Sequence, residues 1–200
     1  MGKKDFAGQH KVFYMKRLFD LILAVCAGLF LLLPFVQLVL LVKLTSKGPV
    51  LYWSDRVGRN NIIFRMPKFR SMRMETPAVA THLLVDPSVY LTPIGSFLRK
   101  TSLDELPQLW SILKGDMSFV GPRPALFNQD DLIELRTQKG IHRLTPGLTG
   151  WAQINGRDEL PIPIKVEFDQ YYLVNKSFLL DLKIIFQTAR RVVLRDGVIH

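Results

Sequence analysis

The longest hydrophobic run of the chain extends from Leu21 to Val42 and contains no formally charged residue. At a rise of 1.5 Å per residue, a straight helix of this length would measure roughly 33 Å, about the thickness of a bilayer core. A signal peptide fits poorly, because its apolar region is usually shorter and no small-residue cleavage site follows the run. The pattern predicts a membrane segment, which either spans the bilayer or enters and leaves by one face.

Two features of this run favour the second topology. Pro34 cannot donate a backbone hydrogen bond and its ring clashes with the carbonyl four residues earlier, which predicts a kink near Leu33. Basic residues flank both ends, namely Lys3, Lys4, Lys11, Lys16 and Arg17 before the run and Lys43, Lys47, Arg56 and Arg59 after it. A spanning helix would carry one of these clusters across the membrane, against the positive-inside tendency, whereas a helix-break-helix keeps both in the cytoplasm. These arguments alone leave both topologies open.

Shorter patterns predict a mixed domain after this segment. Two β-prone stretches, PVLYW and IIFRM, flank a basic loop and predict a hairpin. Lys68 and Arg70 would share one side of its second strand if that strand continues so far. Helical spacing predicts helices within 92–100, 107–114, 129–140 and 177–197. Residues 75–91, 115–124 and 145–157 are typical of loops.

Two of the predicted helices are amphipathic. The one that Pro107 begins and Gly115 ends carries a stripe with Trp110 on it, suited either to a bilayer interface or to the domain core. The C-terminal helix sets Phe178 and its apolar partners opposite Lys183 and other cations, which suits an anionic membrane surface or packing on the domain.

Charge and composition narrow the class of partner. The 200 residues include 27 Lys and Arg against 17 Asp and Glu, a formal net charge of +10. Such a charge indicates a partner that carries phosphate: nucleic acid, anionic lipid or a nucleotide-linked substrate. The hydrophobic share of 48% favours a protein in contact with a bilayer over a free nucleic-acid-binding domain. The single cysteine, Cys26, excludes an internal disulfide and a Cys-based zinc site.

Adjacent acids, Asp104 and Glu105, precede the helix that Pro107 begins. Together with Ser102 they fit a capping box, in which Glu105 would bond to the Ser102 amide and contribute about 1 kcal/mol or less. On a turn, the two acids could instead divide a catalytic task, one binding a divalent cation and the other attacking a substrate. Mg²⁺ is usually held by one or two carboxylates together with substrate phosphates. The residues themselves leave capping and catalysis open.

Two arginines strengthen the catalytic interpretation. Arg99 lies five residues before Asp104 and Arg123 nineteen after it, and a fixed guanidinium binds phosphate oxygens well. Pro122 and Pro124 flank Arg123 and restrict its backbone, which lowers the entropic cost of holding it in place. Acids, arginines and a membrane segment together indicate phosphoryl transfer rather than a hydrolase triad.

Three segments, KFRSM, SLDELPQLWSILKGDMSFVGPRP and TPGLTGWAQINGR, follow the hydrophobic segment in this order. They resemble the bacterial sugar transferases, the monotopic phosphoglycosyl transferases, over residues 16–196. The resemblance implies transfer of a sugar-1-phosphate from a UDP-sugar to a polyprenyl (undecaprenyl) phosphate with release of UMP, a first membrane step of bacterial glycan assembly. It further implies Mg²⁺ as cofactor, and as partners the UDP-sugar, the polyprenyl phosphate and membrane lipids. Downstream glycosyltransferases and a second copy of the chain are compatible partners, and nucleic acid is not one.

The family architecture implied for this chain is α+β and mainly helical. Residues 1–46 would form a basic segment and a re-entrant membrane helix broken near Pro34. Residues 47–200 would form a catalytic domain with amphipathic interfacial helices and a small β-hairpin, on the cytoplasmic face of the inner membrane with both termini cytoplasmic.

Roles for single residues follow from the resemblance by position. It makes Asp104 the nucleophile that forms a covalent aspartyl-phosphosugar and Glu105 the Mg²⁺ ligand. The implied substrate- and phosphate-binding residues are Arg99, Arg123 with its neighbours Pro122 and Pro124, Lys68 and Asp169. The segment YWSDRVGRN and Pro67 depart from the family pattern, which concerns contacts to the sugar rather than the chemistry. Two alternatives are a membrane-anchored basic scaffold and a glycosyltransferase that transfers the sugar alone and releases UDP.

Overall fold

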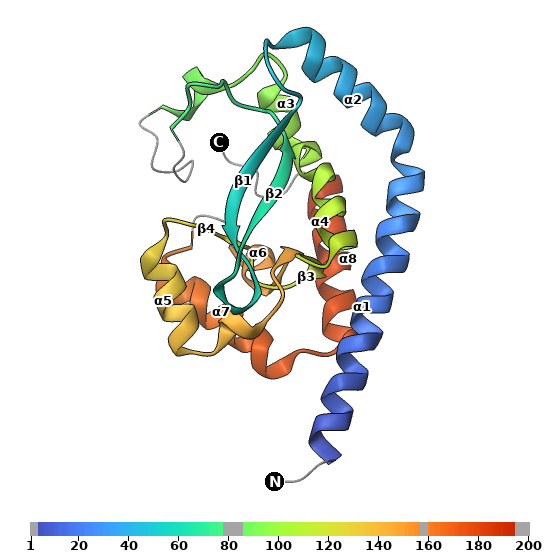
Figure 1. Cartoon of the computed structure of the whole chain (residues 1–200), viewed down its shortest axis with the longest axis vertical. Helices are drawn as coiled ribbons and strands as arrows, with labels where there is room; N and C mark the ends of the chain where they lie inside the picture. Colours follow the sequence, from blue (N-terminus) through green and yellow to red (C-terminus); the bar gives the residue numbers. More distant parts are fainter. Residues whose placement is uncertain (1–3, 78–85, 157–159, 195–200) are drawn as a thin grey trace.

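The structure, a computed structural model, describes residues 4–77, 86–156 and 160–194 (Figure 1), without the side chains of 4–13, 193 and 194. The side chains of Lys3, Lys4 and Lys11, the middle of the predicted loop 75–91 and Arg157 therefore lie outside the described part. Two helices of the N-terminal segment lie along one side of a mixed domain, which contains a central β-hairpin and several short helices. This is the mainly helical α+β fold that the sequence predicts.

The hydrophobic run forms two helices, α1 (Lys4–Phe30) and α2 (Leu32–Thr45), bent by 64° between them. No single helix in the described ranges has the length and hydropathy to cross a membrane, but this bent pair meets both criteria together. It has the composition of a broken span or of a re-entrant hairpin. The bend lies at Leu31, earlier than predicted, because the Pro34 ring acts on the carbonyl of the residue four positions before it.

Arg17 and Asp20 attach α1 to the domain through backbone groups. The Arg17 guanidinium donates to the carbonyls of Ile112 and Leu113, at 2.5 and 2.7 Å, at the end of α4 (Leu109–Lys114). These carbonyls are the negative end of the helix dipole, where a cation is favoured. The buried carboxylate of Asp20 accepts a hydrogen bond of 3.1 Å from the amide of Phe119. Polar groups thus fix the position of an apolar helix.

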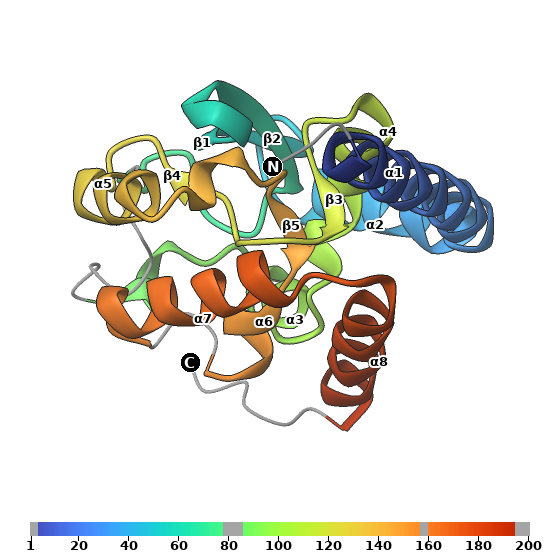
Figure 2. The ribbon, with the colours of Figure 1, turned by 90° about the horizontal axis from the view of Figure 1, so that it is seen from below.

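A third polar contact joins α1 to α8 (Phe178–Leu194). Lys16 forms an ion pair of 2.7 Å with Asp181, whose other oxygen accepts a bond of 2.6 Å from the Tyr172 hydroxyl. Burial, together with the charge of Asp181, raises the pKa of Tyr172, so its phenol remains a donor. Phe19 packs edge-on against Phe178, with ring centroids 5.2 Å apart. Figure 2 shows α1, α2 and α8 together on one side of the molecule.

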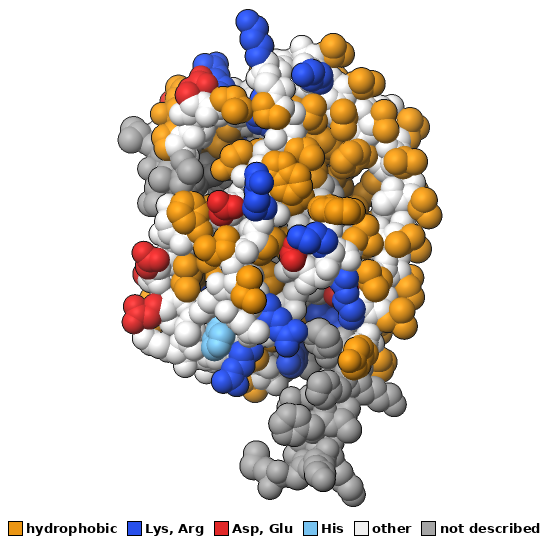
Figure 3. Space-filling model, viewed as in Figure 1, with side chains coloured by type: hydrophobic (Ala, Val, Ile, Leu, Met, Phe, Trp, Pro, Cys, Tyr) orange, Lys and Arg blue, Asp and Glu red, His pale blue; other side chains and the backbone are white. Residues whose placement is uncertain are grey.

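The second helix packs on the other half of the domain. Leu38 and Val42 are buried on α2 and form a cluster with Phe69 and Leu98. The outward faces of the two helices remain apolar and exposed, and Figure 3 shows them as a continuous hydrophobic edge. Its members are Tyr14, Met15, Leu18, Ile22, Val25, Leu29, Phe30, Leu32, Leu33, Val36, Leu40, Leu41 and Leu44.

The predicted hairpin is confirmed. Strands β1 (Leu51–Val57) and β2 (Ile63–Phe69) pair antiparallel, and the short β4 (Ala125–Leu126) adds to β1, giving the order β2-β1-β4. The turn is a 3-10 segment, η1 (Arg59–Asn61), in which two asparagines adopt positive φ. Asparagine tolerates this conformation better than most residues, which explains a turn without glycine at these positions.

Helices and short strands complete the domain. The remaining elements are η3 (Pro87–Tyr90), α3 (Gly95–Lys100), η4 (Leu103–Gln108), β3 (Ser118–Val120), α5 (Asp130–Gln138), η5 (Ile141–Arg143), β5 (Gly147–Thr149), α6 (Trp151–Ile154) and α7 (Ile162–Asn175). The interpretation of 145–157 as a loop was wrong, because β5 pairs parallel with β3 and α6 follows it.

The amphipathic helices divide their apolar residues between core and surface. On α4, Ile112 is buried while Trp110 and Leu113 are exposed. On α8, Ile184 is buried, whereas Phe178 and other members of the predicted apolar face are exposed. Both helices therefore expose apolar side chains, and Figures 1 and 2 show the two helices on the side of the domain where α1 and α2 lie.

We expect Asp181→Asn to lower the free energy of unfolding by about 2 kcal/mol, because Lys16 loses its counter-charge and a buried charge-assisted bond is lost. Urea denaturation of detergent-solubilised protein measures the change. Lys114→Gln, which removes an exposed ion pair with Asp116, is the control and should cost less than about 1 kcal/mol. Equal losses in the two variants would contradict the role given to Asp181.

Candidate active site

The acidic pair lies on η4, packed against β2, rather than on an α-helix. Ser102 precedes it in the left-handed conformation, with φ 57°, and the Glu105 amide donates to the Ser102 carbonyl at 3.2 Å. The prediction of a capping box is wrong, because the Ser102 side chain makes no capping hydrogen bond and the Ser102 amide donates to the Arg99 carbonyl instead of to Glu105. The α-helix itself starts at Leu109, not at Pro107. The side chains of Asp104 and Glu105 are therefore available for other partners.

Cations from two distant segments converge on this pair. Lys68 of β2 places its Nζ 2.8 Å from Glu105 Oε1 and 3.9 Å from Asp104 Oδ2. Arg123 Nη2 lies 3.0 Å from the same Glu105 oxygen. Glu105 is thus bonded to two cations, while Asp104, 7% exposed, forms a single, longer ion pair with Lys68 within the part of the chain that the structure describes. The two adjacent carboxylates have different surroundings.

This difference shifts their pKa values in opposite directions. Burial raises the pKa of Asp104, against the charge of Lys68, and the negative charge of Glu105 adds to the rise. Burial would also raise the pKa of Glu105, but Lys68 and Arg123 outweigh it by charge and hydrogen bonds and hold that pKa well below its usual range. Two neighbouring carboxylates with pKa values moved apart are typical of a site in which each has its own task.

Arg99, the other predicted phosphate-binding arginine, extends from the last turn of α3. Its Nη1 lies 3.4 Å from the sulfur of Met72, and its charge lowers the pKa of Asp104. The structure therefore brings Arg99 within electrostatic range of the acids, on the opposite side in sequence from Arg123.

The loop of Pro122, Arg123 and Pro124 is held by close backbone packing. The Gly121 amide donates to the Thr149 carbonyl at 2.9 Å, and the Gly147 amide donates to the Pro122 carbonyl at 2.9 Å. A Cβ on Gly121 would collide with the carbonyl of Thr145, so only glycine permits this approach. The two motifs GPRP and TPGLTG thus pack as one unit that positions Arg123.

Behind this loop lies a buried ion pair between Asp169 and Arg136. Asp169, 1% exposed, accepts hydrogen bonds from Arg136 Nη2 at 2.6 Å and Nε at 2.9 Å. The remaining nitrogen, Nη1, donates to the Arg123 carbonyl at 2.8 Å. Asp169 therefore bonds to Arg136, and Arg136 in turn supports the loop that carries Arg123. Sequence reasoning missed Arg136, although its spacing of four from the buried Leu132 places both on one face of α5.

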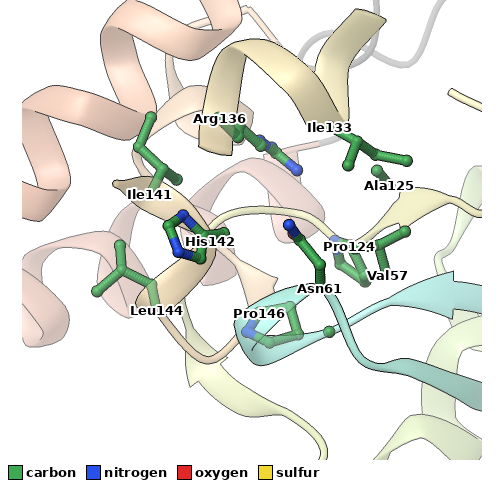
Figure 4. Close-up of a pocket in the computed structure, with 11 residues that line it drawn as sticks. Val57, Asn61, Pro124, Ala125, Ile133, Arg136, Ile141, His142, Leu144 and Pro146 are labelled. Atoms are coloured by element: carbon green, nitrogen blue, oxygen red, sulfur yellow. The ribbon is translucent and has the colours of Figure 1, made fainter. Parts of the chain in front are cut away.

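A small gap adjoins this support. It measures about 30 Å³, and in Figure 4 the Arg136 side chain extends across it from α5 toward the segment with Pro124 and Ala125. A space of this size accommodates no more than a water molecule or two. It is a packing feature behind the loop and not a substrate site.

The acidic pair is chemically suited to Mg²⁺, which takes oxygen ligands and is often held by one or two carboxylates plus substrate phosphates. No cluster of three or more His, Cys, Asp or Glu that could hold a metal occurs within residues 4–77, 86–156 and 160–194. At sites with few carboxylates, substrate phosphates and water commonly complete the coordination of Mg²⁺.

The sequence model of the family described as "Bacterial sugar transferase" matches residues 11–195, nearly the whole chain. The chain belongs to this family. The chain is 42% identical over 190 residues to the "Uncharacterized sugar transferase EpsL" of Bacillus subtilis. The match covers 92% of this chain and 90% of that protein.

Two longer relatives are matched over part of their length. The "Undecaprenyl-phosphate galactose phosphotransferase" of Salmonella typhimurium is 37% identical over 202 residues, with 92% of the sugar transferase and 41% of that relative covered. A protein of Aeromonas hydrophila, named "UDP-N-acetylgalactosamine-undecaprenyl-phosphate N-acetylgalactosaminephosphotransferase", is 37% identical over 189 residues. The match covers 92% of the sugar transferase and 45% of that protein, so the chain spans less than half of these two relatives.

We expect the buried pair behind the loop to be strongly coupled. Asp169→Leu should lower the free energy of unfolding by about 3–5 kcal/mol, because it leaves Arg136 charged and buried. The double variant Arg136→Met/Asp169→Leu should recover most of this loss, because an apolar pair has no unpaired charge. Urea denaturation of the single and double variants forms a double-mutant cycle. Additive losses would contradict a direct pair.

Proposed function

We propose that this sugar transferase moves a sugar-1-phosphate from a UDP-sugar to undecaprenyl phosphate and releases UMP. The observation that carries the proposal is the unequal pair: a buried carboxylate, Asp104, beside a second one, Glu105, that is bonded to Lys68 and Arg123. The names of the relatives from S. typhimurium and A. hydrophila agree on the undecaprenyl phosphate and differ in the sugar. The sugar is therefore not part of the proposal.

Asp104 is the nucleophile of the first step. Its oxygen attacks the β-phosphorus of the UDP-sugar, the P–O bond to UMP breaks, and UMP leaves with the electron pair. Glu105 is less suited to act as the nucleophile, because its Oε1 is already bonded to Lys68 and Arg123, which lowers its nucleophilicity. Arg99, Lys68 and Arg123 supply positive charge around the transferred phosphorus, where fixed charge stabilises phosphoryl transfer.

An oxygen of undecaprenyl phosphate then attacks the phosphorus of the aspartyl-phosphosugar. The bond to Asp104 breaks and its carboxylate is restored, so one phosphoanhydride is consumed and another formed. A covalent intermediate replaces one encounter of two anionic substrates with two separate steps. Supported from behind by Arg136 and Asp169, the loop of Pro122, Arg123 and Pro124 would hold Arg123 toward the nucleotide.

Glu105 would hold Mg²⁺ together with substrate phosphate oxygens, and the bound ion would neutralise charge on the diphosphate. The chain's own cations act at the same place: Lys68 contacts both acids and can turn to a phosphate oxygen when substrate arrives. Arg99 and Arg123 supply the rest of the positive charge around the phosphates.

We further propose that α1 and α2 form a re-entrant hairpin, so that residues 1–46 are a membrane unit and 47–200 a catalytic domain on the cytoplasmic face. The basic flanks on both sides favour this topology over a broken span. Neighbouring helices support a membrane-facing surface, because they too expose large apolar side chains: Phe97, Trp110, Leu113, Phe178, Leu179, Leu182 and Phe186. A site at that depth meets the lipid phosphate where it already lies.

Incubation with a UDP-sugar and Mg²⁺, without lipid acceptor, should release about one equivalent of UMP per protein and leave a sugar-phosphate adduct, because the second step lacks its acceptor. Asp104→Asn should form no adduct, whereas Asp116→Asn, an acid outside the site, should form it normally. Intact-mass spectrometry and nucleotide chromatography measure both products. Release of UDP would indicate a glycosyltransferase. Release of neither UMP nor UDP would indicate a scaffold.

The first step should fail at low pH, because Asp104 must be ionised to attack. Since burial raises its pKa, kcat/KM should begin to fall at a higher pH than an ordinary aspartate with a pKa near 3.9 would give. Lys68→Gln removes a charge that lowers this pKa, so the acid limb should move to higher pH. Arg65→Gln, on the exposed side of β2, should leave it in place. If Lys68→Gln left the acid limb of the kcat/KM profile unchanged or moved it to lower pH, the assignment of Asp104 as the nucleophile would be refuted.

A further inference from the structure

Arg70, the residue that follows strand β2, has an incomplete set of partners. Arg70 follows the last residue of β2 and is only 3% exposed. Its Nη2 donates to the carbonyl and the hydroxyl of Ser46, at 3.1 and 2.7 Å, where α2 ends. Its Nε and Nη1 have no hydrogen-bond partner within the described parts of the chain. The contact with Ser46 therefore accounts for one of the three guanidinium nitrogens.

A buried guanidinium with unused donors is costly. Arginine stays charged at all relevant pH values, and a buried charge is stable only when it is paired or fully hydrogen-bonded. The carbonyl end of α2 offsets part of this cost through the helix dipole. The donors on Nε and Nη1 remain, and an anion is the partner that satisfies both charge and hydrogen bonding.

The space for such an anion is present. A pocket of about 370 Å³ is lined by Arg70 together with Lys47, Arg73 and one carboxylate, Glu75. The hydroxyl-bearing residues Thr45, Ser46 and Thr92 complete much of the lining. Three cations against one acid leave a net charge of +2 around a space large enough for a phosphate group and several waters.

Gly48 shows that the backbone here is shaped around the arginine. It has φ of 114°, and a Cβ at this position would collide with Arg70 Nη1. Any other residue would be strained in conformation and would displace the guanidinium. The chain leaving α2 therefore passes closely over Arg70, which is one of the residues that line the pocket.

The position of the pocket indicates what carries the anion. It lies where α2 ends, beside the exposed Leu41 and Leu44, the latter 82% exposed. The apolar outer face of α2 here gives way to cations, and Figure 1 shows this end of α2 beside α3 and the open end of the β-hairpin, where β1 begins and β2 ends. In a helix whose apolar face meets a bilayer, such a transition lies at headgroup depth.

We propose that the pocket around Arg70 is a second anion site, separate from the acidic pair, which binds a phosphate group carried by a membrane lipid. Lys68 on β2 and Arg70 just after it are two residues apart but have different partners: Lys68 contacts Glu105, and Arg70 contacts Ser46. A lipid phosphate bound at Arg70 would thus lie next to the reaction site along β2.

Binding of the full-length protein to vesicles tests the proposal, and turnover is not needed, so the outcome is independent of the proposed reaction. The probes are vesicles of phosphatidylcholine alone and vesicles containing phosphatidate, whose phosphate is an exposed monoester. The protein should prefer phosphatidate, and Arg70→Gln should weaken this preference about tenfold, the effect of losing one strong charge-assisted contact. Arg65→Gln, the same change elsewhere on β2, should not.

Because Arg70→Gln also loses the contact with Ser46, a second variant leaves that contact intact. Lys47→Gln/Arg73→Gln changes two exposed pocket residues and should also lose the preference, whereas its charge-matched control, Arg65→Gln/Lys139→Gln, should retain it. Equal binding by pocket variants and controls would overturn the site. A thermal shift with inorganic phosphate that depends on Arg70, without any preference for phosphatidate, would overturn the assignment to a lipid.

Discussion

The attachment of an apolar helix by charged side chains is the constraint on which the rest of this structure depends. Lys16, Arg17 and Asp20 are polar residues at the inner face of α1, and each bonds to a different element of the domain: α8, α4 and the start of β3. Contacts of this kind are directional, so they fix the height and rotation of the helix. From Tyr14 onward, the exposed face of α1 can then remain apolar without loosening the attachment.

The same principle is repeated in the site, where ion pairs form two layers. In the front layer, Lys68 and Arg123 meet Glu105 and leave Asp104 with a weaker contact. In the rear layer, Arg136 and Asp169 hold the backbone of Arg123. The side chains of the front layer are partly exposed, whereas those of the rear layer are buried. A rigid support behind exchangeable charges is what a phosphoryl-transfer site requires.

Strand β2 connects the membrane segment to this chemistry. Its last two residues and the next one have different partners: Lys68 reaches the acids, Phe69 packs against Leu38 and Val42 of α2, and Arg70, just after the strand, bonds to Ser46 at the end of that helix. Three successive residues therefore join the acidic pair, the apolar core under α2 and the cationic pocket.

Local patterns in the sequence determined the parts that depend on neighbouring residues. The apolar run, the bend caused by Pro34, the hairpin and the helix end at Gly115 all follow from composition and backbone preferences over a few positions. The acidic pair, Arg123 and Lys68 were also visible as candidates, because their motifs are compact. Their proximity was not visible, since Lys68 and Glu105 are separated by 37 positions.

Only the tertiary structure decided the contacts between distant segments. Arg136 is on a polar helix, and its pairing with Asp169 depends on how α5 packs against α7, 33 positions further along the chain. The short strand β5 gains its partner from β3, a segment far from it in sequence, so no local period marks it. The pocket at Arg70 likewise forms only because the end of α2 returns to β2. The physical reason is common to all three: long-range packing, and not local preference, determines which buried polar groups find partners.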